Sequence, residues 1–289
     1  MPGIWKSEAG RDAVLARYAE FLRYWPQPCV QRSLPTSQGE TFVIEGGKEG
    51  APVVVFLHGG SSNSVTWLRD AAVLGERFKV YAVDMIGEPG FSAPARPPLA
   101  SEAYATWLEE VMAGLGVERA ALVGISLGGW LALDFAIRRP GRVSALALLC
   151  PGGVGATRNI LLWAAPLLLT GPWGRKLVLK RLGSDAVTRA AAASPAAQAF
   201  GAFIGLIRDN FRPRREPLPR FTDAALRGLT MPLLAIMGGK DAILDMHEAR
   251  ARLSAQVAQA EIRWLPEAGH FLIGHGAEID AFLAKALLA

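Results

Sequence analysis

The sequence predicts an α/β protein built on a mostly parallel central sheet that is flanked by helices. Short apolar runs alternate with helical segments from residue 51 to 149, and the alternation resumes at residue 232. The apolar runs are continuous, as in residues 53–57 (Val-Val-Val-Phe-Leu), which is typical of strands covered on both faces. With 289 residues, 51% of them hydrophobic, the chain can bury a large core.

The first fifty residues do not follow this alternation of strands and helices. Residues 8–24 have helical periodicity, with apolar side chains on one face, and prolines follow them. Residues 30–34 and 41–45 look like short strands joined by the turn-rich sequence Thr-Ser-Gln-Gly. Such a pair suits the antiparallel edge of a larger sheet.

The alternating part follows in a simple order, which predicts one parallel sheet with helices on both faces. The predicted strands are residues 53–57, 80–84, 120–123, 143–149, 232–237 and 261–265, and the predicted helices are residues 65–74, 101–115, 130–139, 246–257 and 277–288.

Residues 152–228 break the rhythm. They are rich in Leu, Ala, Arg and Pro and contain helical stretches but no run typical of a strand. Because strands of the same pattern stand on either side, we expect a helical insertion in one domain. The expected core domain is therefore residues 1–151 and 229–289.

The composition argues against several classes of protein. The net charge of +5 is modest, and no basic block interleaves with aromatic residues as on a nucleic-acid-binding surface; Arg212–Arg215 is expected to be a solvated loop. The apolar run 160–170 is too short to span a bilayer and contains a proline. A monomer or a homodimer is expected.

The two cysteines, Cys29 and Cys150, lack the spacing of metal ligands or of a disulfide framework. Reduced thiols and the lack of an apolar signal segment at the N-terminus favour a cytoplasmic protein. We expect neither a metal ion nor an organic cofactor.

The sequence Gly124-Ile-Ser126-Leu-Gly128 joins a buried strand to a helix, which is the context of a nucleophile elbow. Glycines relieve crowding in so tight a turn. The serine hydroxyl would stand at the helix N-terminus, where N–H groups favour negative charge. The alternative, an ordinary serine in a glycine-rich turn, fits the pentapeptide but not its flanks.

A serine nucleophile needs a base, and the base needs an orienting acid. His270 follows the last predicted strand, and Asp241 follows the strand before it. The order Ser126, Asp241, His270 is the one expected for a hydrolase triad on an α/β sheet. Asp245 is the alternative acid, and Asp241 itself could be a simple turn residue.

The other three histidines are not expected to act as the base. His58 ends a central strand and is expected to hold the glycine-rich loop behind it, whereas the other two match no motif. The backbone N–H of Leu127 is expected to donate to an oxyanion, together with that of Gly60 or, as an alternative, Ser61. The competing interpretation of this loop is a glycine-rich turn without a catalytic role.

Five sequence features together resemble the α/β-hydrolase superfamily, from residue 40 to the end of the chain. They are His58-Gly59-Gly60, Asp84-x-x-Gly87-x-x-Gly90-x-Ser92, Gly124-x-Ser126-x-Gly128-Gly129, Gly239-x-Asp241 and Gly269-His270. Within the superfamily the chain resembles bacterial carboxylesterases of the naproxen-esterase type. The commoner superfamily form is Asp-x-x-Gly-His-Gly-x-Ser, and this chain has Glu88-Pro89 in the middle of the motif instead.

The resemblance implies an α/β-hydrolase fold in which residues 152–228 form a helical cap over the substrate pocket. Packing alone is the alternative role for the apolar residues of this region. The candidate substrate-binding residues are Ser61, Trp67, Trp130, Leu162, Trp163 and Leu167. For Trp67 and Trp130, packing in the core is the favoured role.

The sequence therefore predicts a serine hydrolase that cleaves small carboxylic esters with apolar groups through an acyl-enzyme. A C–C bond hydrolase of the meta-cleavage type or a lactonase could use the same triad. A non-enzymatic ligand receptor on a hydrolase scaffold is a more distant alternative. Serine at the elbow argues against haloalkane dehalogenases and epoxide hydrolases, which need aspartate there.

Overall fold

A computed structural model of the chain describes residues 3–179 and 194–288, except for the side chains of residues 160–163, 175 and 179. Its centre is an eight-stranded sheet with the strand order β1-β2-β4-β3-β5-β6-β7-β8. The strands are β1 (Cys29–Leu34), β2 (Thr41–Gly47), β3 (Val53–Leu57), β4 (Lys79–Val83), β5 (Ala120–Ile125), β6 (Val143–Leu149), β7 (Leu233–Gly238) and β8 (Ala260–Leu265).

The sheet is antiparallel at one edge and parallel elsewhere. β2 pairs antiparallel with both β1 and β4, and all other pairs are parallel. Every residue of β5 and β7 is buried, which explains their continuous apolar sequences. The predicted α/β class and the antiparallel edge are confirmed.

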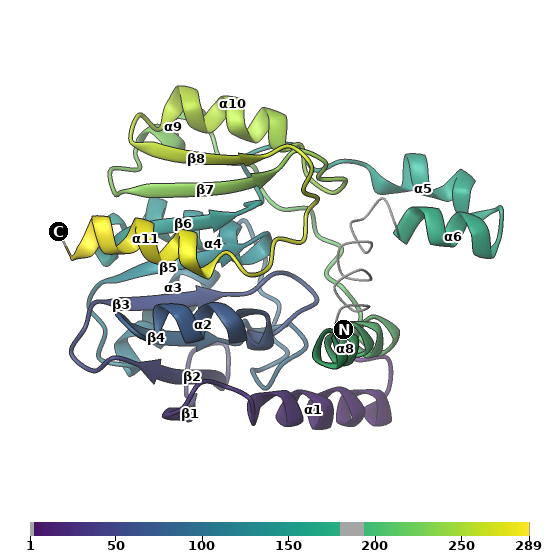
Figure 1. Cartoon of the computed structure of the whole chain (residues 1–289), viewed down its shortest axis with the longest axis horizontal. Helices are drawn as coiled ribbons and strands as arrows, with labels where there is room; N and C mark the ends of the chain where they lie inside the picture. The colour runs from purple at the N-terminus through teal and green to yellow at the C-terminus, as the bar shows by residue number, and fades with distance from the viewer. Residues whose placement is uncertain (1–2, 180–193, 289) are drawn as a thin grey trace.

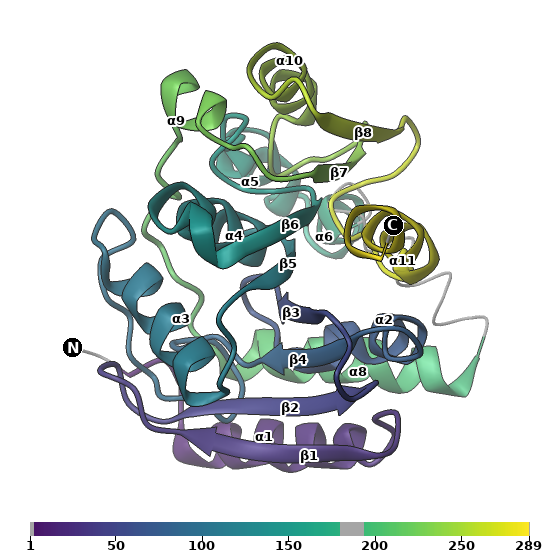
Figure 2. The ribbon, with the colours of Figure 1, turned by 90° about the vertical axis from the view of Figure 1, so that its left-hand side faces the viewer.

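Helices cover both faces of the sheet, as Figures 1 and 2 show. α2 and α11 pack side by side on one face, and α3 and α4 lie on the other. α9 and α10 lie beside each other near β7 and β8. Their bounds are α2 (Leu68–Leu74), α3 (Ala103–Gly114), α4 (Leu127–Arg138), α9 (Asp223–Arg227), α10 (Met246–Gln256) and α11 (Gly276–Leu287), and a 3-10 turn, η1 (Ser64–Trp67), precedes α2.

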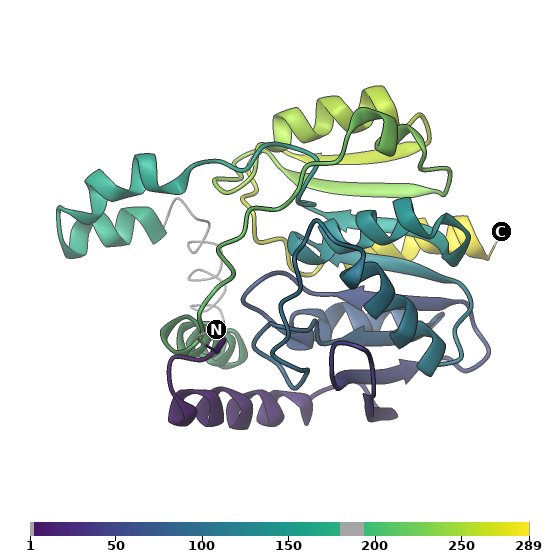
Figure 3. The ribbon, with the colours of Figure 1, turned by 180° about the vertical axis from the view of Figure 1, so that it is seen from behind.

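The N-terminal helix α1 (Glu8–Leu22) lies along α8 (Pro195–Asn210), although strands β1 to β6 lie between them in the sequence (Figure 3). Ser7 caps α1 by accepting a hydrogen bond from the Gly10 N–H. Phe21 and Phe203 meet with ring centroids 5.2 Å apart. A methyl group at Gly10 would collide with the Asn210 side chain, so this glycine permits the close approach.

Two further helices, α5 (Ile160–Leu168) and α6 (Pro172–Leu179), also lie between β6 and β7 in the sequence. They pack against each other and project away from the sheet in Figures 1 and 3. Leu169, between them, and Trp173 on α6 are 89% and 66% exposed. In the described residues, no helix has the length and apolarity needed to cross a membrane.

Candidate active site

The turn from β5 into α4 holds Ser126 in a backbone conformation that few side chains adopt. Its φ is 54° and its ψ is −109°. The two flanking glycines have no room for a side chain. A methyl group at Gly124 would lie 2.4 Å from the Gly128 oxygen, and a methyl group at Gly128 would lie 2.1 Å from the Leu57 oxygen. Both glycines are therefore required by the close approach of β3, β5 and α4 at this point.

Ser126, His270 and Asp241 form a continuous hydrogen-bonded line. His270 Nε2 lies 2.9 Å from Ser126 Oγ, and His270 Nδ1 lies 2.6 Å from Asp241 Oδ2. The histidine and the aspartate are buried, whereas the serine is partly accessible. The three side chains come from the carboxyl ends of β5, β7 and β8, which lie at the same edge of the parallel sheet.

The Asp241 carboxylate is itself fixed by backbone. Its Oδ1 accepts hydrogen bonds from the N–H groups of Ile243 and Leu244, at 2.8 and 2.9 Å. The alternative acid, Asp245, instead caps α10 by accepting from the Glu248 N–H at 3.1 Å. The structure thus pairs His270 with Asp241 and gives Asp245 a structural role.

Cys150 lies beside this line, at the end of β6. Potential ligand atoms of Cys150, Asp241 and His270 all lie within 4.8 Å of one another, a spacing compatible with a metal ion. A thiol binds metal as the thiolate. Burial, and next the Asp241 charge, raise the pKa of the Cys150 thiol well above its usual range, so the thiol is neutral. This argues for a packing role.

The loop after β3 lies directly against the elbow. A methyl group at Gly60 would lie 3.6 Å from Leu127 Cδ2, and one at Gly59 would lie 3.8 Å from Ser126 Cβ. Among the described residues, neither the Gly60 nor the Leu127 N–H has a hydrogen-bond partner. Both groups are therefore available to donate to an oxyanion.

His58 supports this loop as a neutral imidazole. Its Nε2 accepts from the Met85 N–H at 2.9 Å, and its Nδ1 lies 2.8 Å from the Gly59 oxygen. Burial lowers the pKa of His58, which favours the neutral form that these two contacts require.

Asp84 connects the helix η1, the loop after β4 and the N-terminal helix. Its Oδ1 accepts from the Tyr18 hydroxyl and from both the N–H and the hydroxyl of Ser64, and its Oδ2 accepts from the Phe91 N–H. A methyl group at Gly90 would lie 2.3 Å from Asp84 Oδ2. The Asp84-containing motif therefore holds η1, the loop after β4 and the N-terminal helix together.

Two tryptophans that are candidate pocket walls, but for which the sequence favours packing, are buried in the core. Trp67 is 1% exposed and stacks on Phe56 of β3. Trp130 is also 1% exposed, and its indole N–H donates to the Pro219 oxygen at 2.9 Å. Trp130 thus anchors the segment that returns from α8 to the core.

The other suggested pocket residues are spread over the molecule. Ser61 lies in the loop after β3, next to Gly60. Leu167 is half-buried on α5, which projects away from the sheet. The side chains of Leu162 and Trp163 lie outside the described part of the structure.

Sequence reasoning missed Glu88, whose Oε2 accepts the Ser61 N–H at 2.6 Å. The departure of this position from the superfamily pattern was the available signal.

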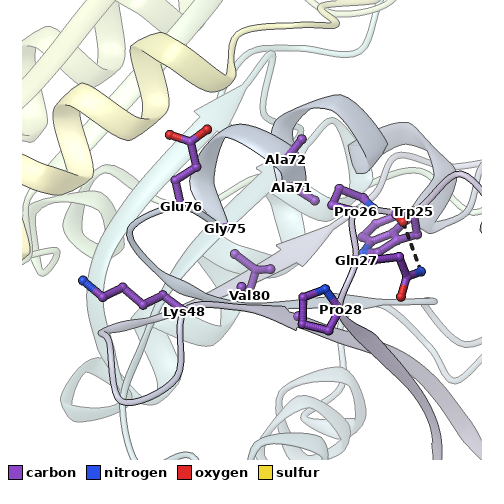
Figure 4. A pocket seen from close by; sticks show the side chains of 12 residues that line it. Trp25, Pro26, Gln27, Pro28, Lys48, Ala71, Ala72, Gly75, Glu76 and Val80 are labelled. Atoms are coloured by element: carbon purple, nitrogen blue, oxygen red, sulfur yellow. Dashed lines mark hydrogen bonds between the residues drawn. The ribbon is translucent and has the colours of Figure 1, made fainter.

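A cavity of about 230 Å³ lies elsewhere, between β2, α2 and the segment after α1 (Figure 4). Trp25, Pro28 and Val80 line it, and Lys48 and Glu76 stand at its rim. None of the proposed triad or oxyanion residues lines this cavity, so we do not assign it to the chemistry of Ser126.

The parallel sheet, with its elbow after β5, places the chain in the class of α/β-hydrolase-fold enzymes. Comparison with known proteins gives the family. The model of the alpha/beta hydrolase family matches residues 54–282, and the chain belongs to that family. The protein is a hydrolase.

Bacterial carboxylesterases are similar over nearly the whole chain. The carboxylesterase nap of Bacillus subtilis is 32% identical over 259 residues, which cover 88% of this chain and 85% of the relative. The carboxylesterase YbfK of the same organism is 28% identical over 88% of this chain and 86% of its own length. The crystal structure of a naproxen esterase from Bacillus subtilis matches with a TM-score of 0.78 and 29% identity over 97% of this chain and 99% of that one. The predicted resemblance to the naproxen-esterase type is confirmed.

Proposed function

We propose that the protein is a carboxylesterase that uses Ser126 as nucleophile, His270 as general base and Asp241 as the orienting acid. The observation that carries the proposal is the pair of contacts of His270, 2.9 Å to the Ser126 hydroxyl and 2.6 Å to the Asp241 carboxylate. The likeness to two bacterial carboxylesterases supports an ester as substrate.

The chemistry follows from the directions of these hydrogen bonds. Ser126 Oγ attacks the ester carbonyl while its proton passes to His270 Nε2. The carbonyl oxygen becomes negative, and the Gly60 and Leu127 N–H groups stabilise it. The C–O bond of the ester then breaks, and the proton on Nε2 goes to the leaving alkoxide.

The second half repeats these steps with water. Water gives a proton to His270 Nε2 as it attacks the acyl carbonyl, and the bond to Ser126 Oγ breaks as that oxygen regains the proton. Asp241 holds the imidazole in the tautomer whose Nδ1 carries hydrogen, which leaves Nε2 free to accept. These steps call for no metal and no organic cofactor.

For substrate class, we propose small esters with apolar groups and a helical cap formed by residues 152–228. Support comes from the apolar sequence of α5 and from the exposed Leu169 and Trp173 beside it. Such surfaces contact an apolar substrate more favourably than they contact water.

The test is turnover of p-nitrophenyl esters of increasing acyl length by the wild type and by Ser126→Ala. We expect the wild type to hydrolyse the esters and the variant to lose about 10⁴-fold or more in kcat. A variant with wild-type turnover would remove the mechanism. Faster turnover of a dienoate diketone or a lactone than of every ester would replace the ester assignment.

A further inference from the structure

The loop that carries Gly60 is fastened by a buried carboxylate. Glu88 is 3% exposed, and its Oε2 accepts the Ser61 N–H at 2.6 Å. It belongs to the motif around Asp84, in the Glu88-Pro89 pair that departs from the commoner superfamily pattern. No step of the proposed mechanism uses this side chain.

The hydrogen bond from Ser61 to Glu88 decides which N–H of the loop can serve an oxyanion. A backbone N–H points in one direction, and that of Ser61 points at Glu88. The adjacent N–H, that of Gly60, has no partner among the described residues. The contact thus removes Ser61 from the two candidate donors and leaves Gly60.

The same bond holds Ser61 in an unusual conformation. Its φ is 57°, in the left-handed region that L-residues rarely adopt. The other non-glycine residues with positive φ, among those that the structure describes, are Ser126 and Cys150. All three adjoin the site, and residues held in such conformations need surrounding contacts to keep them there. Glu88 supplies that contact for Ser61.

Two arginines partly offset the burial of the Glu88 carboxyl. Burial disfavours the negative charge of Glu88, and the charges of Arg96 and Arg214 oppose that effect in part by attracting the carboxylate. Arg96 is fixed by donating to the Gly87 oxygen at 2.9 Å, and Arg214 by donating to the Tyr104 hydroxyl at 2.7 Å.

We propose that Glu88 is a positioning residue: it fixes Ser61 through its N–H and thereby aims the Gly60 N–H at the oxyanion. This rests on the proposed function, because it assigns Gly60 to the oxyanion hole of the same site. Glu88 acts through the backbone of the loop and does not touch the substrate.

The test compares Glu88→Gln, which keeps an accepting oxygen, with Glu88→Ala, which removes it. The measurements are kcat and KM on p-nitrophenyl butyrate and the Ki of a short trifluoromethyl ketone, which binds serine hydrolases as a tetrahedral adduct. For Glu88→Ala we expect kcat to fall about 10²-fold, Ki to rise by a similar factor, and KM to change little. Glu88→Gln should stay within a few-fold of the wild type in all three.

Asp70→Asn is the matched control. Asp70 is a second buried carboxyl, also 3% exposed, but it lies on α2 against Gly276 of α11, whereas Glu88 accepts the Ser61 N–H. We expect its substitution to leave kcat and Ki unchanged. If Glu88→Ala does not fold, Glu88→Met fills the space without a carboxylate and carries the same expectation.

Two results would overturn the proposal: wild-type kcat and Ki in Glu88→Ala, or equal losses in Glu88→Ala and Glu88→Gln. Either would leave the proposed function standing as long as Ser126→Ala is inactive. Failure of the proposed function has a different signature, because the wild type would then show no ester turnover that depends on Ser126.

Discussion

His270 Nδ1 lies 2.6 Å from Asp241 Oδ2, although 29 positions and a complete helix and strand separate the two residues in the sequence. The parallel pairing of β7 with β8 brings their carboxyl ends together. The loops after these neighbouring strands then place an acid against an imidazole, which is what the order of the motifs along the sequence predicts.

Asp241→Asn should therefore lower kcat by about 10⁴-fold with little change in stability, because an amide no longer stabilises the tautomer that leaves Nε2 free. The measurement is kcat on a p-nitrophenyl ester. Asp245→Asn is the control, since Asp245 lies only four residues away but caps α10 instead of contacting His270. Similar losses in the two variants would contradict the assignment of the acid.

Gly128→Ala should disrupt the elbow, because the new methyl group would lie 2.1 Å from the Leu57 oxygen and 2.5 Å from that of His58. Backbone on both sides prevents relaxation, so we expect a loss of about 3 kcal/mol or more in the free energy of unfolding. Urea denaturation would measure it. Gly141→Ala has open space around it and should change stability by less than about 0.5 kcal/mol. Equal stabilities for the two variants would show that the elbow is not so tightly packed.

Tyr18→Phe should weaken the attachment of the N-terminal helix to Asp84. The substitution removes the 2.8 Å hydrogen bond to Asp84 Oδ1 and leaves a buried carboxylate with one donor fewer. The expected loss in the free energy of unfolding is about 1–3 kcal/mol. Tyr24→Phe is the control, because Tyr24 is 75% exposed. A Tyr18 variant as stable as this control would mean that the bond contributes nothing.

Glu88 should also make stability depend on pH. Burial raises the pKa of Glu88 from its ordinary 4.5 to about 7, although the Ser61 N–H and the two arginines oppose the shift. Between these two values the folded protein binds more protons than the unfolded chain, so stability falls as pH rises. The pKa difference corresponds to about 3 kcal/mol.

Glu88→Gln should remove this dependence. We expect the difference in free energy of unfolding, Glu88→Gln minus wild type, to increase by up to about 3 kcal/mol as the pH rises from 4.5 to 8. Urea denaturation at a series of pH values would measure it. Asp70, whose pKa burial raises to about 6, contributes equally to both proteins and cancels in the difference. A constant difference at every pH would contradict the raised pKa of Glu88.

The sequence predicted the sheet and the three residues of the hydrogen-bonded line because both depend on local patterns. A continuous apolar run such as Val53–Leu57 indicates a buried strand, and parallel strands bring the residues that follow them to a common edge. The positions of Ser126, Asp241 and His270 after such runs were therefore informative without any knowledge of side-chain contacts.

The contacts that could not be predicted depend on packing between distant segments. The sequence favoured packing for Trp130, but it could not show that the segment returning from α8 covers the indole and accepts its N–H at the Pro219 oxygen. Nothing in the periodicity of α1 indicates that it packs on α8. The role of Glu88 depends on a 2.6 Å contact with a loop 27 residues away, which no spacing rule specifies.

The most direct test of the account is covalent labelling of the protein with a fluorophosphonate, followed by peptide mass spectrometry. We predict a single modification on Ser126, blocked by heat denaturation, absent from Ser126→Ala, and accompanied by complete loss of ester turnover. Full ester turnover by a protein whose Ser126 stays unmodified, or a label on another residue, would contradict the claim that Ser126 is the nucleophile.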